Sequence, residues 1–197
     1  ETNIITFYPA HEQTAEILIG CSEESYETEK NVFIVGEGGP TNITVAGDFN
    51  VIESGKILLM KDSDCQKPNV AIHELLHVLG FDHSKNSKNI MYEMSRCDQT
   101  VGEDIINLID KLYSTPSYPD LLFENASASM HGKYLNINFS LRNNGFQNSE
   151  ESFVNIMANG KQVERIEIPQ IEIGYGKVYQ NIFMKNNDDD ALQAYSN

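Results

Sequence analysis

The stretch from position 73 to position 83 reads H-E-L-L-H-V-L-G-F-D-H and decides how this 197-residue chain is interpreted. On an α-helix, His73 and His77 lie four residues apart, so their imidazoles project from the same face. Gly80 follows, and because glycine has no Cβ it can adopt the left-handed conformation that ends a helix and turns the chain back. The turn returns His83 toward the two helical histidines. Three imidazoles that converge on one point predict a metal site.

Zinc is the metal that fits this predicted site. Zinc sites with three protein ligands and an open fourth position are typically catalytic, whereas structural zinc sites are usually closed by four protein ligands. A zinc ion held in this way lowers the pKa of its bound water to about 7. Glu74 is then expected to accept a proton as general base and to deliver it to the leaving amine of a cleaved peptide bond.

A second motif follows the histidines, because Asn89-Ile90-Met91-Tyr92 stands shortly after His83. The pattern H-E-x-x-H-x-x-G-x-x-H followed by a methionine turn is the signature of the metzincin metallopeptidases, and the chain resembles that clan. Residues 79–84 (L-G-F-D-H-S) and 90–92 (I-M-Y) are most similar to its matrixin branch. Matrixins commonly have proline at the position of Glu93, so the chain departs from them there. A bare H-E-x-x-H also occurs on helices that merely expose two histidines, and the longer pattern argues against that reading.

The resemblance implies further roles. Met91 is expected to lie beneath the metal as an apolar floor for the imidazoles, and Tyr92 is not expected to be a ligand. An edge strand is expected to pair with an extended substrate through backbone hydrogen bonds, while side-chain pockets supply selectivity. Residues Glu93 to Ser95 would help form the pocket on the leaving-group side. The candidate substrate-binding residues on the edge strand are Asn42, Ile43, Thr44, Val45 and Ala46.

Composition excludes several classes of partner. The net charge of −15 and the pI near 4.6 argue against nucleic acid, because phosphate would be repelled. The hydrophobic fraction of 40% suffices for a core. No apolar run reaches the roughly 18 residues that predict a membrane-spanning helix. The chain has no secretory signal at its start and opens with Glu1, which indicates a processed protein or an expressed fragment.

The three cysteines are informative by position. Cys65 lies just before the predicted zinc helix and Cys97 just after the methionine turn, so a disulfide between them would join the segments that frame the metal. Such a bond implies an oxidising compartment and favours a secreted or cell-surface protein. The alternative is three buried or free thiols in a cytosolic protein. Cys21 is the unpaired thiol on the favoured reading.

A first domain is expected at residues 1–115 and a linker at 116–119. Short β-branched or apolar segments predict strands. Pro68 is placed to begin the helix that carries the zinc motif. A second helix is predicted at residues 102–113, where apolar residues recur at helical spacing. Compared with matrixins, the first strand and the long first helix have no counterpart, which predicts that a natural N-terminal part is missing. The expected strands are residues 4–8, 16–21, 32–35, 41–46 and 56–60, and the expected helices are 68–79 and 102–113.

A second domain is expected at residues 120–197. Residues 134–141 alternate between apolar and polar side chains, which predicts a half-buried strand, and further strands are expected at 153–157, 163–168 and 178–184. The pattern predicts a β-sandwich of the immunoglobulin type. Short motifs within residues 118–185 resemble the cell-adhesion-related domain of bacteria and archaea, and a generic sandwich is the alternative. They are Asp120-Leu121-Leu122, Arg142-Asn143-Asn144-Gly145 and Asn159-Gly160-Lys161.

Other polar residues carry weaker expectations. His11 and His131 are expected to be surface histidines, and residues 186–190 are expected to be a solvated loop rather than a calcium site. No strand pattern follows Lys185. The predicted cofactor is Zn²⁺, bound by the three histidines of the motif, and Ca²⁺ is not indicated.

The sequence thus predicts an α+β chain, in which a metzincin-like domain precedes an all-β immunoglobulin-like sandwich. The expected function is that of a zinc-dependent endopeptidase acting on extended protein or peptide substrates, with a broad or a narrow target range. The sandwich is expected to serve adhesion or targeting, with a cell-surface ligand as its candidate partner. The alternative is a surface adhesion protein whose zinc-binding domain is inactive.

Overall fold

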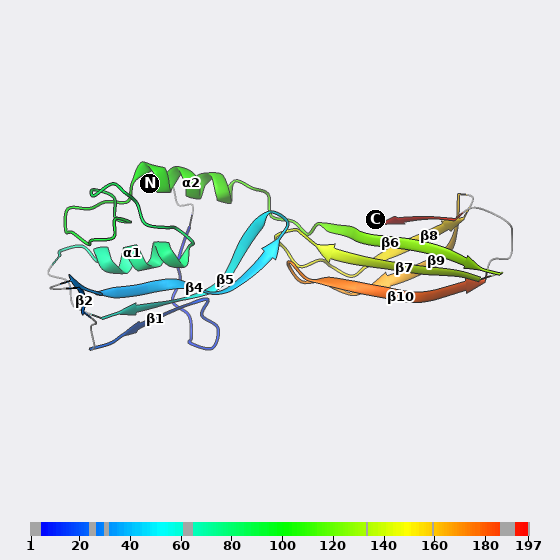
Figure 1. The fold of residues 1–197 in the computed structure, drawn as a ribbon, viewed down its shortest axis with the longest axis horizontal. Helices are drawn as coiled ribbons and strands as arrows, with labels where there is room; N and C mark the ends of the chain where they lie inside the picture. Colours follow the sequence, from blue (N-terminus) through cyan, green and yellow to red (C-terminus); the bar gives the residue numbers. More distant parts are fainter. Residues whose placement is uncertain are drawn as a thin grey trace. The chain divides into compact units, whose positions relative to one another are not determined.

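The computed structural model describes residues 5–23, 27–29, 32–60, 65–132, 134–158, 160–185 and 192–196. Its elements are shown in Figure 1. The chain divides into two compact units, of which the first comprises Glu1–Ile43 and Ile52–Pro116. The second comprises Thr44–Val51 and Ser117–Asn197. The chain leaves the first unit for the last time after Pro116, inside the stretch expected to be a linker. Eight residues of a hairpin, Thr44–Val51, are grouped with the second unit, although the rest of that hairpin belongs to the first.

The first unit contains a three-stranded sheet of order β1-β5-β4. Strand β1 runs parallel to β5, with Ile17 opposite Gly55. Strand β4 pairs with β5 and lies at the edge of the sheet among the described strands. Short strands β2 and β3 form a separate pair. The bounds are β1 Ile17–Cys21, β2 Glu27–Glu29, β3 Val32–Phe33, β4 Gly36–Ala46 and β5 Phe49–Leu59.

The strand predictions for this unit hold in part. Strand β1 confirms the strand expected at 16–21, but residues 5–8 form no strand, and Ile4 lies outside the described residues. Strands β4 and β5 begin earlier than expected, because the two form one long hairpin around Gly47, whose φ is 57°. The stretch G-E-G-G-P at 36–40 has the composition of a turn, yet pairing with β5 holds it extended.

Two helices complete the first unit. Helix α1 spans Asn69–Val78 with Pro68 at its N-cap, and α2 spans Glu103–Tyr113 with Gly102 at its N-cap. Acidic residues in the first turn of α2 and a lysine in its last turn complement the helix dipole. Both helices contribute to one buried apolar cluster, made of Leu76, Ile90, Met91 and Ile105. Neither helix, and nothing else in the described helical segments, has the length and apolar character that crossing a bilayer requires.

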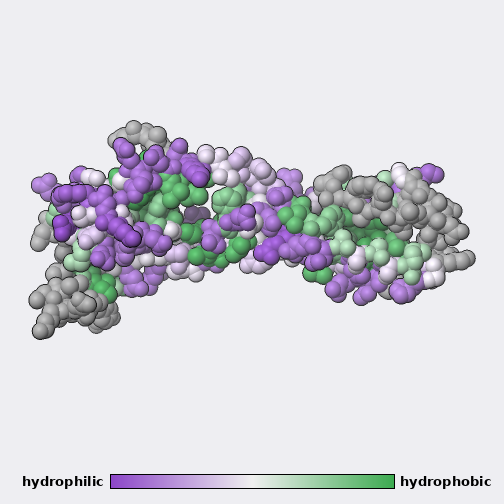
Figure 2. All heavy atoms as spheres, turned by 45° about the horizontal axis from the view of Figure 1, so that its top comes forward, coloured by the Kyte–Doolittle hydropathy of each residue, from purple (hydrophilic) through white to green (hydrophobic). Residues whose placement is uncertain are grey.

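The second unit contains two antiparallel three-stranded sheets, of order β10-β7-β6 and β11-β8-β9. Their inner faces share one core, to which β7 contributes the alternating Leu135, Ile137, Phe139 and Leu141. Hydrophilic residues cover much of the visible face of the molecule in Figure 2, as the acidic composition predicts. The bounds are β6 Leu121–His131, β7 Tyr134–Asn143, β8 Ser152–Ala158, β9 Lys161–Ile168, β10 Gly176–Lys185 and β11 Leu192–Ser196.

Two strands of this unit were not expected. Strand β6 reads L-L-F-E-N-A-S-A-S-M-H, and its residues from Glu124 onward are exposed, so it shows no alternating pattern. Strand β11 contradicts the prediction that no strand follows Lys185. Among the described strands each lies at an edge and pairs with one neighbour, and this pairing is not visible in the local sequence. Residues 186–190, expected to be a solvated loop, lie outside the described residues.

Candidate metal centre

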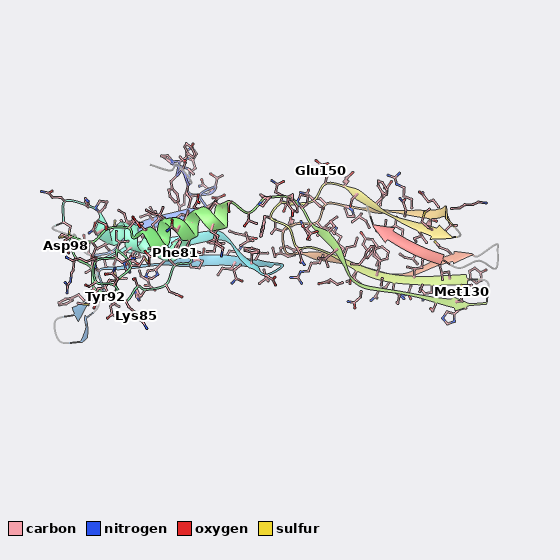
Figure 3. All side chains as sticks on the ribbon, turned by 90° about the horizontal axis from the view of Figure 1, so that it is seen from above. Phe81, Lys85, Tyr92, Asp98, Met130 and Glu150 are labelled. Carbon is pink, nitrogen blue, oxygen red and sulfur yellow. A yellow bond between two sulfur atoms is a disulfide. The ribbon has the colours of Figure 1, made fainter. Side chains whose placement is uncertain are left out.

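Helix α1 and the turn after it place the three histidines. Gly80 has a φ of 88°, as its predicted left-handed role requires. Its N–H donates to the carbonyl of His77 and the N–H of Phe81 donates to the carbonyl of Leu76, each at 3.0 Å. These two bonds form a Schellman motif, which satisfies the last carbonyls of the helix and reverses the chain. Figure 3 shows Phe81, Lys85 and Tyr92 on the loop that follows. The reversal carries His83 back over α1.

The three imidazoles converge on one point. The Nε2 atom of His77 lies 3.0 Å from Nε2 of His73 and 3.2 Å from Nε2 of His83. The ligand atoms of all three residues lie within 4.8 Å of one another. Zinc–nitrogen bonds of about 2.0–2.1 Å at tetrahedral angles separate two ligand nitrogens by about 3.3 Å. The spacing therefore fits a zinc ion.

Hydrogen bonds on the far side of two rings fix their tautomers. Nδ1 of His73 lies 2.6 Å from the carbonyl oxygen of Ile90, and Nδ1 of His77 lies 2.7 Å from that of Phe81. Because a carbonyl can only accept, each Nδ1 carries the ring proton and each Nε2 presents a lone pair. Two lone pairs 3.0 Å apart repel each other unless a cation lies between them. Burial lowers the pKa of His73 and of His77, which also favours the neutral, ligating form.

The methionine turn packs against α1 and the segment after it. Met91 is 1% exposed and packs with Leu76 of α1. The N–H of Ser84, the residue after His83, donates to the carbonyl of Met91 at 2.7 Å. The turn is thereby tied to both segments that carry the three histidines, although the role of Met91 as a floor beneath the metal stays a prediction.

A buried asparagine that the sequence analysis did not single out shapes this turn. Asn89 is 3% exposed, and its Oδ1 accepts the N–H of Met91 at 2.9 Å. Its Nδ2 donates to both carboxylate oxygens of Asp104 in the first turn of α2, at 3.1 and 3.2 Å. The only local signal is the tendency of asparagine to bond the backbone two residues on. Nothing in the sequence pairs Asn89 with Asp104.

Glu74 lies beside the histidines and is 6% exposed. Its pKa is raised from 4.5 to about 7, chiefly by burial and also by the nearby charge of Glu37, and a hydrogen bond from the backbone of Gly38 opposes both effects. Strand β4 covers this residue closely. A Cβ at Gly36 would lie 2.7 Å from Oε1 of Glu74, and a Cβ at Gly38 would overlap the Glu74 backbone. Only glycine fits at these two positions of β4.

The predicted substrate-binding residues lie farther along the same strand. Asn42 and Ile43 belong to the first unit, whereas Thr44, Val45 and Ala46 are grouped with the second. Gly36 and Gly38, at the start of β4, lie against Glu74. The pairing role of Asn42 to Ala46 stays a prediction.

The cysteines frame the site. Cys65 and Cys97 form a disulfide that spans 32 residues and encloses α1 and the methionine turn. Beside it, Nδ2 of Asn69 donates to the carbonyl of Arg96 at 2.7 Å, which joins the same two segments. Cys21 is an exposed free thiol on β1.

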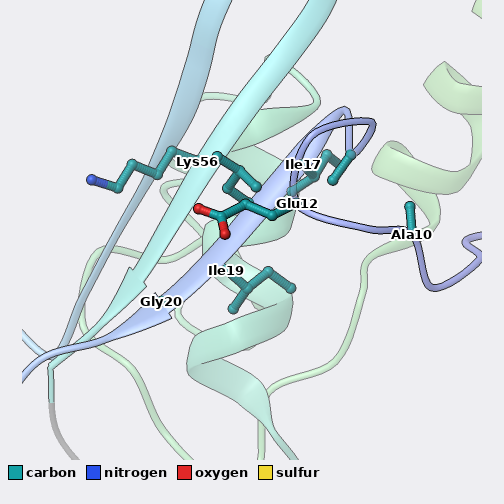
Figure 4. A pocket seen from close by; sticks show the side chains of 8 residues that line it. Ala10, Glu12, Ile17, Ile19, Gly20 and Lys56 are labelled. Carbon is teal, nitrogen blue, oxygen red and sulfur yellow. The ribbon is translucent and has the colours of Figure 1, made fainter.

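A groove elsewhere in the first unit contains none of the predicted site residues. It runs along β1, where Figure 4 shows Glu12, Ile17, Ile19 and Lys56 around it. The histidines outside the motif, His11 and His131, are exposed, as expected. The metal centre is therefore the only histidine cluster in the described residues.

The fold and the three-histidine centre define a metallopeptidase-like domain followed by a β-rich domain. Comparison with protein-family models matches residues 2–114 to Matrixin and residues 118–190 to CARDB, the cell-adhesion-related domain. The first match covers more than half of the chain, so this protein belongs to the matrixin family. Comparisons with curated proteins and with solved structures found no match. The resemblances to both families are thereby confirmed.

Proposed function

We propose that this protein is a zinc-dependent endopeptidase that cuts extended protein segments. The observation that carries the proposal is the convergence of three imidazole nitrogens next to a buried glutamate, in a chain of the matrixin family. His73, His77 and His83 would hold the zinc ion. When bound, zinc supplies Lewis-acid polarisation of a water molecule and of the peptide carbonyl.

Glu74 is the proton carrier of the proposed reaction. A pKa raised to about 7 places its carboxyl group where it can both accept and return a proton near neutral pH. Its place between α1 and β4 excludes bulk water from one side, and the backbone of Gly38 orients it. In this role Glu74 accepts a proton from the attacking water and delivers it to the leaving amine.

The substrate would bind as an extra strand at the outer edge of β4. That edge carries backbone groups that β5 does not use, and an extended peptide can pair with them. The glycines at 36 and 38 let the main chain of β4 itself lie close to Glu74, which brings the edge strand next to the candidate general base. Pro40 donates no hydrogen bond, so pairing would be interrupted there. The substrate class is therefore an unfolded or loop segment rather than a folded surface.

A secreted or cell-surface setting belongs to the same proposal. The Cys65–Cys97 disulfide supports an oxidising compartment. The CARDB match supports an accessory role in adhesion or targeting for the second domain, which we propose to be an immunoglobulin-like sandwich.

The test is cleavage of an unfolded protein by the purified full chain, with metal content measured in parallel. Loss of cleavage on chelation, recovery with Zn²⁺, and no cleavage by Glu74→Gln at full zinc content would support the endopeptidase. One bound zinc per chain with no cleavage of any unfolded protein would favour the alternative, an adhesion protein with an inactive metal domain. A chain that binds no zinc would refute both.

A further inference from the structure

The tip of the β4–β5 hairpin is built into the second unit. The strands are eleven residues each, and residues Thr44–Val51 around their turn group with Ser117–Asn197 rather than with the rest of the hairpin. Ala46, the last residue of β4, is fully buried. One strand therefore begins in the first unit and ends in the second.

The tip packs against other residues of the second unit. The rings of Phe49 and Phe146 meet edge to face, with centroids 4.9 Å apart and an interplanar angle of 88°. Gly174 has a φ of 72°, and a Cβ there would overlap Thr44 and the carbonyl of Val45. The tip thus lies against Gly174 as closely as backbone allows, with an aromatic pair beside it.

The loops that receive the tip are held rigidly by Asn143, which is fully buried. Its Oδ1 accepts the N–H groups of Asp120 and Gly145, each at 3.0 Å. Its Nδ2 donates to the carbonyls of Gln147 and Ile171, at 2.7 and 3.1 Å. All the hydrogen-bonding capacity of the Asn143 amide is used to fix the segment that carries Phe146. The loops against which the hairpin tip packs are therefore held in place by their own hydrogen bonds.

The other end of β4 lies against the candidate catalytic glutamate. Gly36 and Gly38 lie so close to Glu74 that a side chain at either position would overlap it. The place of β4 therefore decides how this edge meets the glutamate. An edge strand that pairs with only one neighbour opens easily unless its ends are held.

We propose that the second unit orders the substrate-binding edge strand through this tip, with Phe49 and Phe146 as positioning residues. The inference rests on the proposed function for its catalytic consequence, but its structural part stands alone. Seating the tip holds β4 extended before substrate arrives, so less order has to be gained on binding. The CARDB-matched segment would then take part in peptide binding without touching the substrate.

Hydrogen exchange of the full chain, loaded with zinc, tests the structural part. Removing the aromatic pair in Phe49→Ala or in Phe146→Ala is expected to speed amide exchange in residues 36–43 roughly 3- to 10-fold, the range that loss of one aromatic pair predicts. Phe49→Tyr, which keeps the edge-to-face packing, should exchange like the wild type. Tyr134→Ala is the matched control, because Tyr134 is exposed and lies at the opposite end of β7 from Asn143.

Kinetics test the catalytic part. Both alanine variants should raise KM for an unfolded protein substrate about 3- to 10-fold while kcat and zinc content stay within about twofold, since the residues act only through β4. A merely structural role would lower the active fraction and hence kcat instead. Should one variant fail to fold, the other carries the test.

Unchanged exchange in residues 36–43 of a folded Phe49→Ala or Phe146→Ala protein would overturn the inference. A wild type that binds zinc but cleaves nothing would remove the proposed function, and the exchange result would still decide whether the tip orders β4. Faster exchange together with unchanged KM would overturn the catalytic consequence alone.

Discussion

Nδ1 of His73 donates to the carbonyl of Ile90, 2.6 Å away and 17 residues later, so the methionine turn orients the first histidine of the candidate metal centre. The same turn is held by Asn89 through its bonds to Met91 and Asp104. The N–H of Ser84 ties the segment after His83 to Met91. The metal centre is thus not a property of α1 alone, because its geometry depends on the turn and on the start of α2.

Replacing Asn89 should weaken zinc binding although Asn89 is not a ligand. Asn89→Ala removes the bonds that shape the turn, so Nδ1 of His73 loses a well-placed acceptor. Outer-shell partners of zinc ligands typically contribute 10- to 100-fold in affinity, and we expect a loss of about tenfold. Competition with a chromophoric chelator measures it. Asn107→Ala, an exposed position on α2, should bind like the wild type, and equal affinities in the two variants would refute the role of Asn89.

The burial of Glu74 should appear in the pH dependence of stability of the metal-free protein. Its folded pKa is raised from 4.5 to about 7, so the folded state binds more protons than the unfolded state between those values. The contribution of Glu74 is therefore fully present below pH 4.5 and is lost as pH rises through about 7. Glu74→Gln stays neutral and should be more stable than the wild type by about 1–3 kcal/mol at pH 8.

Urea unfolding of both metal-free proteins at pH 5 and pH 8 checks this expectation. The difference between variant and wild type should shrink as the pH falls. A difference that is the same at both values would show that the Glu74 carboxyl group is not strongly desolvated in the fold.

The disulfide should contribute measurably to stability. Changing Cys65 and Cys97 together to serine removes a cross-link across 32 residues, and such loops typically contribute about 2–4 kcal/mol. Thermal unfolding should show a lower Tm for the double variant, while Cys21→Ser, which alters only an exposed thiol, should unfold like the wild type. An unchanged Tm in the double variant would mean that the bond adds nothing to the fold.

Asn143→Ala should destabilise the second unit. The change removes the partner of the N–H groups of Asp120 and Gly145 and of the carbonyl of Gln147, while the carbonyl of Ile171 still accepts from the N–H of Ser149. Each buried polar group left unsatisfied costs about 1–3 kcal/mol. Partial relaxation reduces the sum, so we expect about 2–5 kcal/mol by urea unfolding. Asn125→Ala on the exposed strand β6 is the control. Similar midpoints for the two variants would contradict the assignment of Asn143 as the centre of the loop network.

Some features could be predicted from the sequence because local spacing determines them. The helical offset of His73 and His77 and the left-handed turn at Gly80 are properties of a few consecutive residues, and the structure brings these groups together. The alternation of apolar and polar side chains along β7 likewise predicts the face that the structure buries in the core.

Other features depend on partners distant in sequence. Strand β6 pairs with β7 and strand β11 pairs with β8, and neither segment has an alternating sequence that predicts a strand. The glycines at 36 and 38 read as a turn, yet they are required by contact with a helix more than thirty residues later. The bond between Asn89 and Asp104 and the packing of Phe49 on Phe146 are likewise invisible before the chain folds.

The central claim is that this chain hydrolyses peptide bonds with zinc and Glu74. The most direct measurement compares wild type and Glu74→Gln, each shown to hold one zinc per chain, in the cleavage of a single unfolded protein. We predict products from the wild type only, with a loss of at least about 100-fold in kcat/KM for the variant, the lower end of what a general base contributes. Equal cleavage by both proteins, or cleavage that survives complete removal of zinc, would contradict the account.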